Sequence, residues 1–200
     1  MDVKAAYLNG KLKEEIFMEP LPGLDTSVDM VLRLIKAVYS TKQGGWVWYE
    51  EICQTFRNMG YTRTSANHAV FIHTCDNIFS IIILYVDDLM LSSTCLKAML
   101  EDKDFLMKHY LMTDLGEASW ILGVQVTRDH DTGWIALLQQ KYIEDMLEQY
   151  GMLGTCPIST PILPNQHLAK LSSPKVDIKT YQCAMGVLMY PMLATCPDIA

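Results

Sequence analysis

The chain has 200 residues, of which 50% are hydrophobic and 20% are charged, a composition typical of folded globular proteins rather than disordered ones. Its 16 Lys and Arg residues against 23 Asp and Glu residues give a net charge of -7. This balance excludes a basic protein that simply coats nucleic acid, because phosphate binding depends on clustered cations. It leaves open an enzyme that holds nucleic acid locally around central carboxylates.

The cysteines and the apolar segments restrict the cellular compartment. None of the six cysteines forms a CxxC pair, which argues against a zinc knuckle or a thioredoxin-type site. The opening segment MDVKAAYLNG lacks the basic start and apolar stretch of a signal peptide. The longest apolar run, residues 78–86, is far too short to cross a bilayer as a helix. We therefore expect a protein of the cytoplasm or the nucleus that is not secreted.

Short strands and one helix are predicted in the first 60 residues. We expect strands at residues 1–8, 15–18 and 31–34, where apolar residues precede turn signals or alternate with polar residues. A helix is predicted over residues 42–59 from the helical spacing of its apolar residues. The pair Gly44-Gly45 is expected to weaken its first turn, at up to ~1 kcal/mol per glycine relative to Ala.

A buried hairpin is predicted next, with arms at residues 69–73 and 78–85 around Cys75-Asp76-Asn77. The second arm is almost continuously apolar, so we expect a central strand that is buried on both faces. A helix over residues 95–109 should follow. Its expected inward residues are Leu96, Met99, Leu100 and Leu106.

The C-terminal part is predicted to contain one more hairpin and two helices. The hairpin spans residues 120–126 and 134–138, and a helix over residues 140–150 follows it. Residues 155–174 are rich in Pro, Ser and Thr and are predicted to be a loop. A final helix from Thr180 should be interrupted at Pro191. The order of elements predicts an α+β chain with an antiparallel sheet.

Tyr85-Val86-Asp87-Asp88 is the segment most suggestive of chemistry, because two adjacent acids interrupt an apolar hairpin at an energetic cost. One interpretation is a tight turn, where Asp is common. The other is a metal site, since hard divalent cations prefer carboxylate oxygens. Asp2 could supply a third carboxylate, although an acid near a terminus is commonly just solvated.

The order of the motifs along the chain distinguishes these interpretations. The chain resembles the reverse transcriptase of copia-type LTR retrotransposons, in which the corresponding first, second and last segments usually read DVKTAFLNG, YGLKQAPRAWY and YLALATRPDIA. The resemblance covers essentially all 200 residues. Its segments in this chain are DVKAAYLNG, VYSTKQ, YVDD, DLGEASWILGVQV, QQKYIEDMLEQYGMLGTCPISTP and YPMLATCPDIA.

The resemblance implies an α+β fold in which a right-hand polymerase palm, an antiparallel sheet with helices packed on one face, is joined to a partial thumb. Residues 1–138 would be the palm, incomplete at its N-terminus, with the fingers largely missing. Residues 139–154 would form a thumb-like helix. Residues 155–200 would be a linker and the start of a connection toward an absent RNase H domain.

By the same resemblance, the catalytic acids are Asp2, Asp87 and Asp88. Asp2 and Asp87 would be the main ligands of two Mg²⁺ ions, with Val3 beside them at the metal site. Asp88 would be a weaker ligand or an electrostatic support. Two such ions activate the primer 3′-hydroxyl and stabilise the leaving pyrophosphate.

The resemblance also implies a nucleotide site and a primer site. Ala5, Ala6, Tyr7 and Gln43 would bind the incoming nucleotide, and the Tyr7 ring would exclude a 2′-hydroxyl; alternatively, Tyr7 is a core aromatic. Lys42 is interpreted as a surface charge at the helix start. The primer would contact Leu122-Gly123, which could otherwise be ordinary core residues.

Several features depart from the family pattern. Trp46 stands where the family has Arg, Pro191 replaces a Leu, and Cys196 replaces another Arg. Met1 resembles an internal residue of the family's first strand that serves as a start. We therefore expect a truncated fragment that is inactive alone, with an uncovered apolar surface around Trp46 and Trp48.

Three functions remain as hypotheses. The first is a fragment of an RNA-directed DNA polymerase that acts on an RNA template, a DNA primer and deoxynucleotide triphosphates. RNase H and integrase domains of the same polyprotein would be its partners in a longer product, and no membrane is involved. The second is a non-catalytic retroelement remnant or interaction module. The third is another palm-type metal enzyme, such as a nucleotide cyclase, which the thumb-like tail and the DLG segment disfavour.

Overall fold

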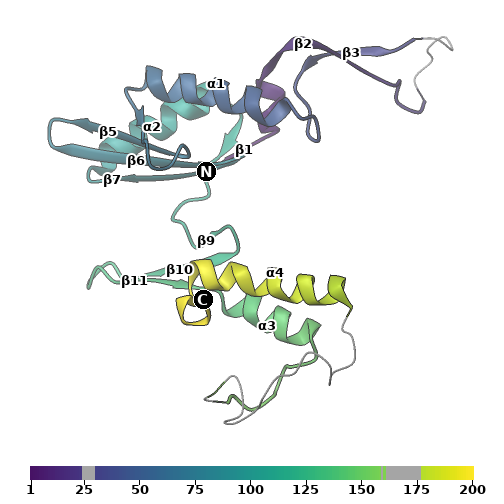
Figure 1. The fold of residues 1–200 in the computed structure, drawn as a ribbon. Coiled ribbons are helices and arrows are strands. Elements are labelled where there is room, and N and C mark those ends of the chain that lie inside the picture. Colours follow the sequence, from purple (N-terminus) through teal and green to yellow (C-terminus); the bar gives the residue numbers. More distant parts are fainter. Residues whose placement is uncertain (24–29, 159, 161–176) are drawn as a thin grey trace. The chain divides into compact units, whose positions relative to one another are not determined.

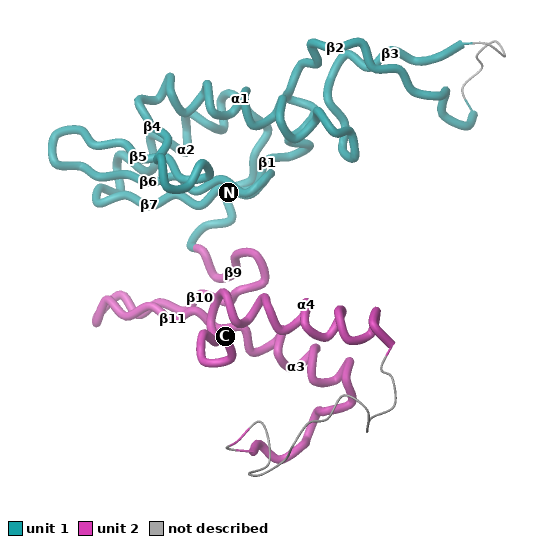
Figure 2. The backbone as a smooth tube through the Cα atoms, in the orientation of Figure 1, with its two compact units in different colours: residues 1–117 teal, residues 118–200 magenta. Residues whose placement is uncertain are grey.

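The chain folds into two compact units, residues 1–117 and 118–200, in a computed structural model that describes residues 1–23, 30–158, 160 and 177–200 (Figure 2). The described residues form four α-helices and antiparallel strands, which confirms the α+β class. The predicted palm boundary at residue 138 concerns polymerase subdomains rather than compact units, and it stays a prediction.

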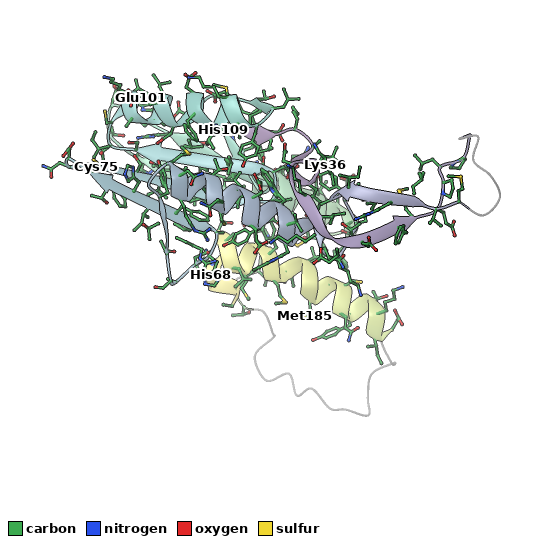
Figure 3. The ribbon with its side chains drawn as sticks, turned by 90° about the horizontal axis from the view of Figure 1, so that it is seen from above. Lys36, His68, Cys75, Glu101, His109 and Met185 are labelled. Atoms are coloured by element: carbon green, nitrogen blue, oxygen red, sulfur yellow. The ribbon has the colours of Figure 1, made fainter. Side chains whose placement is uncertain are left out.

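The first unit carries a six-stranded antiparallel sheet, in the order β4-β5-β6-β7-β1-β8 (Figure 1). Its helices, α1 and α2, lie on one side of this sheet (Figures 1 and 3). The elements of the unit are β1 (Asp2–Val3), η1 (Ala6–Asn9), β2 (Lys11–Met18), β3 (Leu32–Lys36), α1 (Gly44–Asn58), β4 (Thr62–Arg63), β5 (Val70–Cys75), β6 (Ile78–Tyr85), β7 (Asp88–Ser93), α2 (Leu96–His109) and β8 (Met112–Thr113).

The predicted hairpin of β5 and β6 is confirmed, and β6 is a central strand as expected. Asp76 and Asn77 form its two-residue turn with φ of 46° and 65°, the left-handed conformation that a tight hairpin turn requires. Burial on both faces of β6 is wrong. Ser80, Ile82 and Leu84 are buried, whereas the residues between them are only partly covered. The reason is that α1 and α2 cover one face of the sheet and leave the other open.

Helix α1 supplies most of the helical part of the core, where Trp48, Ile52 and Phe56 are at most 1% exposed. It ends as predicted before Gly60, whose φ is +87°. Helix α2 contributes less. Leu106 is fully buried, but the prediction of inward Leu96 and Leu100 is wrong, since these side chains are 66% and 53% exposed.

The strand predicted over residues 1–8 is wrong beyond Val3. The chain leaves the extended conformation at Ala5, whose φ is 49°, and forms the 3₁₀ turn η1. The side-chain amide of Asn9 holds this turn by donating hydrogen bonds to the carbonyls of Ala5 (3.4 Å) and Ala6 (3.1 Å). Asn is a residue that stabilises turns in this way, and here its local bonds outweigh the apolar pattern.

The two short strands predicted next exist but are longer, because they pair with each other. β2 and β3 form an antiparallel hairpin that extends from the rest of the unit (Figure 1). Lys36 lies where this hairpin joins the unit (Figure 3). Much of the hairpin is exposed, including Phe17 at 54% and Ile35 at 77%.

The second unit contains a three-stranded antiparallel sheet, in the order β11-β10-β9, and two helices. Gly151 follows α3 with a φ of +66°, as predicted for a helix stop. Most of the predicted loop, namely residue 159 and residues 161–174, lies outside the described residues. The elements are β9 (Trp120–Ile121), β10 (Val124–Arg128), β11 (Ile135–Leu138), α3 (Gln140–Gln149), α4 (Ile178–Ala194) and η2 (Pro197–Ile199). Among the helices of the described residues, none is long and apolar enough to cross a membrane.

The predicted interruption at Pro191 is wrong, because α4 continues through it to Ala194. Proline lacks the N–H that would bond to the carbonyl four residues earlier, which here belongs to Val187. The hydroxyl of Tyr142 on α3 donates a hydrogen bond of 2.9 Å to that carbonyl. The Tyr142 ring also contacts Tyr190 edge-on, with centroids 4.9 Å apart. A side chain from the neighbouring helix thus replaces the bond that Pro191 removes.

We expect Tyr142→Phe to lower the free energy of unfolding by about 1–2 kcal/mol, because it leaves the Val187 carbonyl without its partner. In a Pro191→Leu background the cost should be smaller, since the introduced leucine would restore the backbone N–H. Urea unfolding of the four members of this double-mutant cycle measures the coupling. Tyr181→Phe, an exposed change on α4, is the matched control and should have no effect. Equal costs of Tyr142→Phe in both backgrounds would contradict the assignment.

Candidate functional site

The pairing of β1 with β7 brings two of the predicted acids together. The Cα atoms of Asp2 and Asp88 are direct partners in this antiparallel pair. The backbone bonds flank them, from Val3 N–H to Asp87 O and from Leu89 N–H to Met1 O, each 2.8 Å. Asp2 and Asp88 are therefore a non-hydrogen-bonded pair, the arrangement in which facing side chains lie closest.

These two acids lie on the sheet face that the helices leave open. Their neighbours Val3 and Leu89 are 1% and 3% exposed and point into the core. Because side chains alternate along a strand, Asp2 and Asp88 point to the opposite face. Both are partly exposed there. The apolar core and the acids thus occupy opposite sides of the same two strands.

Asp87 lies in the tight turn between β6 and β7. Tyr85 pairs with Asp88, so Val86 and Asp87 are the two turn residues. Val86 has a φ of 56°, which is strained for a β-branched residue. The indole N–H of the buried Trp48 donates a hydrogen bond of 2.6 Å to the Val86 carbonyl and fixes this turn on α1.

The charges of the three acids act on one another. Burial raises the pKa of Asp88 above its ordinary value, and the negative charges of Asp87 and then Asp2 raise it further. Burial and then the charge of Asp87 also raise the pKa of the Tyr39 hydroxyl. Negative charge at Asp88 and at the Tyr39 hydroxyl is therefore disfavoured, and a bound cation would relieve this effect.

The acids are nevertheless not closed into a metal cage. Within the described ranges, no group of three His, Cys, Asp or Glu side chains is arranged to hold a metal ion. Asp2 Oδ2 is bound by Lys4 Nζ at 2.5 Å. The donor set fits a divalent cation in its chemistry and its shared sheet face, while the Asp2 side chain is turned to a cation of the chain itself.

Tyr7, on η1, lies beside the turn of Val86 and Asp87, which is called the acidic turn below. Its ring stacks on Tyr39 with centroids 4.3 Å apart and an interplanar angle of 19°. The first turn of α1 lies close to Tyr7. A Cβ atom on Gly44 would come within 3.3 Å of the Tyr7 ring and 2.8 Å of the Val38 carbonyl. Close packing therefore requires glycine at position 44. From the sequence alone, Gly44 was expected only to weaken the first turn of the helix.

The remaining predicted nucleotide residues lie in the same unit. Ala5 is exposed and Ala6 is buried in η1, while Gln43 is exposed at the N-terminal end of α1. Trp46 is 62% exposed, as expected, but Trp48 is 1% exposed, so its expected exposure is wrong. A cavity of about 220 Å³ lies at this end of the sheet; its lining is Tyr7, Gly45, Trp48, Tyr49, Ala69, Leu84, Tyr85 and Val86.

The predicted primer residues belong to the second unit. Leu122 and Gly123 are the turn between β9 and β10, with φ of 50° and 80°. This turn divides the strand that was predicted over residues 120–126. The Leu122 carbonyl accepts a hydrogen bond from the Tyr190 hydroxyl.

Three residues at the acidic turn were not predicted from the sequence: Lys4, Tyr39 and Trp48 as a turn anchor. Lys4 had a detectable signal, because residues two apart in an extended strand share a face. No local sequence signal indicated Trp48 or Tyr39. The partner of Trp48 is Val86, 38 positions away, and the partner of Tyr39 is Tyr7, 32 positions away.

The fold and the acids together define the chain as an α+β protein with carboxylates gathered at one turn of an antiparallel sheet. Its similarity to known proteins identifies the family. Residues 1–164 match the family described as reverse transcriptase (RNA-dependent DNA polymerase). The chain belongs to this family.

Its relatives include transposon proteins. The chain is 36% identical to the retrovirus-related Pol polyprotein of transposon TNT 1-94 from Nicotiana tabacum, matching over its whole length but over 16% of that polyprotein. It is 30% identical to a Ty5-1 transposon protein of Saccharomyces cerevisiae, over the whole chain and 66% of that protein. The Pol polyprotein of transposon RE1 from Arabidopsis thaliana is 28% identical over the whole chain and 14% of its own length. No solved structure matches the chain significantly.

The glycine pair at the start of α1 offers a matched test of the packing around Tyr7. Gly44→Ala should lower the free energy of unfolding by about 1–3 kcal/mol, because its Cβ would overlap backbone that must then shift. Gly45→Ala should raise it by about 0.5 kcal/mol through helix propensity, since its nearest neighbour would be Tyr7 Oη at an ordinary 3.5 Å. Urea unfolding measures both. Effects of the same sign would contradict the packing argument.

Proposed function

We propose that the chain is the palm-containing part of a copia-type, RNA-directed DNA polymerase. The single observation that carries this proposal is the direct pairing of Asp2 with Asp88 beside the Asp87 turn. It brings together the ends of two motifs that lie far apart in the sequence. The resemblance of DVKAAYLNG and YVDD to the family's acidic motifs supports the same reading.

In this proposal residues 1–138 correspond to the palm, residues 139–154 to a thumb-like helix and residues 155–200 to a linker. The open face of the central sheet is the surface proposed for template and primer. An RNA template, a DNA primer and deoxynucleotide triphosphates are the proposed substrates. RNase H and integrase domains would be partners within a longer polyprotein, and the proposed compartment is the cytoplasm or the nucleus.

Asp2, Asp87 and the Val3 backbone are the groups that would hold divalent cations, with Asp88 as a weaker ligand or electrostatic support. When bound, two Mg²⁺ ions would supply the positive charge that activates a primer 3′-hydroxyl and stabilises the leaving pyrophosphate. The strained Val86 turn, anchored by Trp48, holds Asp87 in place before any substrate arrives. Such preorganised charge is commonly the largest contribution to catalysis.

Tyr7 is proposed to select deoxynucleotides. Its stack on Tyr39 fixes the plane of the ring, so the ring can act as a rigid wall against a 2′-hydroxyl. The backbone at Ala5 and Ala6, and the exposed Gln43 side chain, are proposed to contact the nucleotide. Leu122-Gly123 is proposed to contact the primer.

Binding of Mn²⁺, measured by electron paramagnetic resonance, tests the metal site directly. The unaltered chain should bind the ion, and Asp87→Asn with Asp88→Asn should weaken binding by about tenfold or more, because it removes two of the carboxylates that a hard cation prefers. Asp76→Asn is the control, since it neutralises an acid in the turn between β5 and β6. Equal binding by the double variant and the control would contradict the proposal and favour a non-catalytic remnant.

Primer extension on an RNA template separates ion binding from turnover. We expect no measurable extension by the 200-residue chain, because Trp46 supplies no cation where the family has Arg. If the unaltered chain does extend the primer, the expectation of inactivity is wrong. If that extension is then lost in the Asp87→Asn, Asp88→Asn variant, the result still supports the proposed site.

A further inference from the structure

Asp2 already has a cationic partner. Lys4 Nζ lies 2.5 Å from Asp2 Oδ2, and the side chains of Lys4 and Asp2 are 53% and 26% exposed. Among the ion pairs of the described residues, neither Asp87 nor Asp88 has such a partner. The acid that the proposed function needs as a main ligand is therefore the one that is neutralised from within the chain.

The backbone makes this pair a built feature of the sheet. The Lys4 N–H, in the turn directly after β1, donates to the carbonyl of Leu111 at 2.8 Å and so ties this turn to the residue that precedes β8. The Lys4 ammonium lies against the Asp2 carboxylate, so the two side chains are on the same side of the chain here. Ala5, with a φ of 49°, turns the chain away directly afterwards. Lys4 thus lies between the end of β1 and this change of direction, with its side chain on Asp2.

Lys103, another lysine of the first unit, is not a displaceable counter-ion of this kind. Lys103 is bound to both carboxylate oxygens of Asp114, at 3.1 and 2.9 Å, and its side chain is 13% exposed. The Lys4 ammonium, in contrast, is on a half-exposed side chain that can move into solvent. This difference in exposure distinguishes a displaceable cation from a structural one.

We propose that Lys4 is an internal counter-ion that competes with a divalent cation for the Asp2 carboxylate and so sets the affinity of the metal site. This inference rests on the proposed function, which assigns Asp2 to the metal. A divalent cation that binds Asp2 Oδ2 would displace Lys4 from that oxygen, and one that binds Oδ1 would be repelled by the ammonium beside it. Within the described residues, Asp2 is paired with Lys4 and the three acids form no closed cage.

Mn²⁺ affinity of charge-matched variants tests this competition. Lys4→Gln should tighten the Mn²⁺ dissociation constant about three- to fivefold, as expected for removing a partly exposed ion pair. Lys4→Arg keeps the charge and should leave the constant within about twofold of the unaltered chain. Lys42→Gln is the control for net charge, because Lys42 is exposed, lies in the same unit and has no ion pair within the described part of the chain. It should change the constant less than about twofold.

The outcomes separate this inference from the proposed function. Tighter binding by Lys4→Gln alone supports competition, as does binding by Lys4→Gln when the unaltered chain binds no ion. Equal effects of Lys4→Gln and Lys42→Gln would overturn the competition while leaving the metal site intact. Absence of Mn²⁺ binding in every variant, Lys4→Gln included, would overturn both. Melting temperatures of the variants confirm that each is folded.

Discussion

The position of β1 between β7 and β8 is the constraint on which the rest of the first unit depends. This two-residue strand places Asp2 opposite Asp88 and, at the same time, sends Val3 into the core. A slip of one residue would exchange the two faces, burying a carboxylate and exposing a valine. The packing of the core therefore specifies the register, and the register gathers the acids. In this way an ordinary hydrophobic requirement positions groups that could not assemble themselves, since like charges repel.

Local sequence signals predicted the parts of the fold in which the determinants are local. The hairpin of β5 and β6, helix α1 and the glycine stops at Gly60 and Gly151 follow from periodicity and turn chemistry. The three acids were predicted from the order of motifs, and the structure brings Asp2 and Asp88 face to face. The extended segment over residues 1–8 failed as a prediction, because Asn9 stabilises a turn that the apolar pattern does not reveal.

Other features that escaped prediction depend on contacts that appear only in the folded unit. Trp48 anchors the Val86 turn, and Tyr142 replaces the hydrogen bond that Pro191 cannot make. Gly44 is required by the approach of the Val38 carbonyl rather than by any turn. Pro191 and the Gly44-Gly45 pair are local defects by propensity, yet Pro191 and Gly44 are each accommodated by a specific contact in the folded chain. Departures from a family pattern are therefore not in themselves signs that the fold has decayed.

The most direct test of this account is the Hα–Hα nuclear Overhauser effect between Asp2 and Asp88 in the 200-residue chain. A non-hydrogen-bonded antiparallel pair brings the two Cα atoms to about 4.5 Å, which gives a strong cross-peak between their Hα protons. We expect that cross-peak, together with slow exchange of the Val3 and Leu89 amide protons. Its absence, or a cross-peak from Asp2 to Leu89 instead, would contradict the claim that the sheet register gathers the acids.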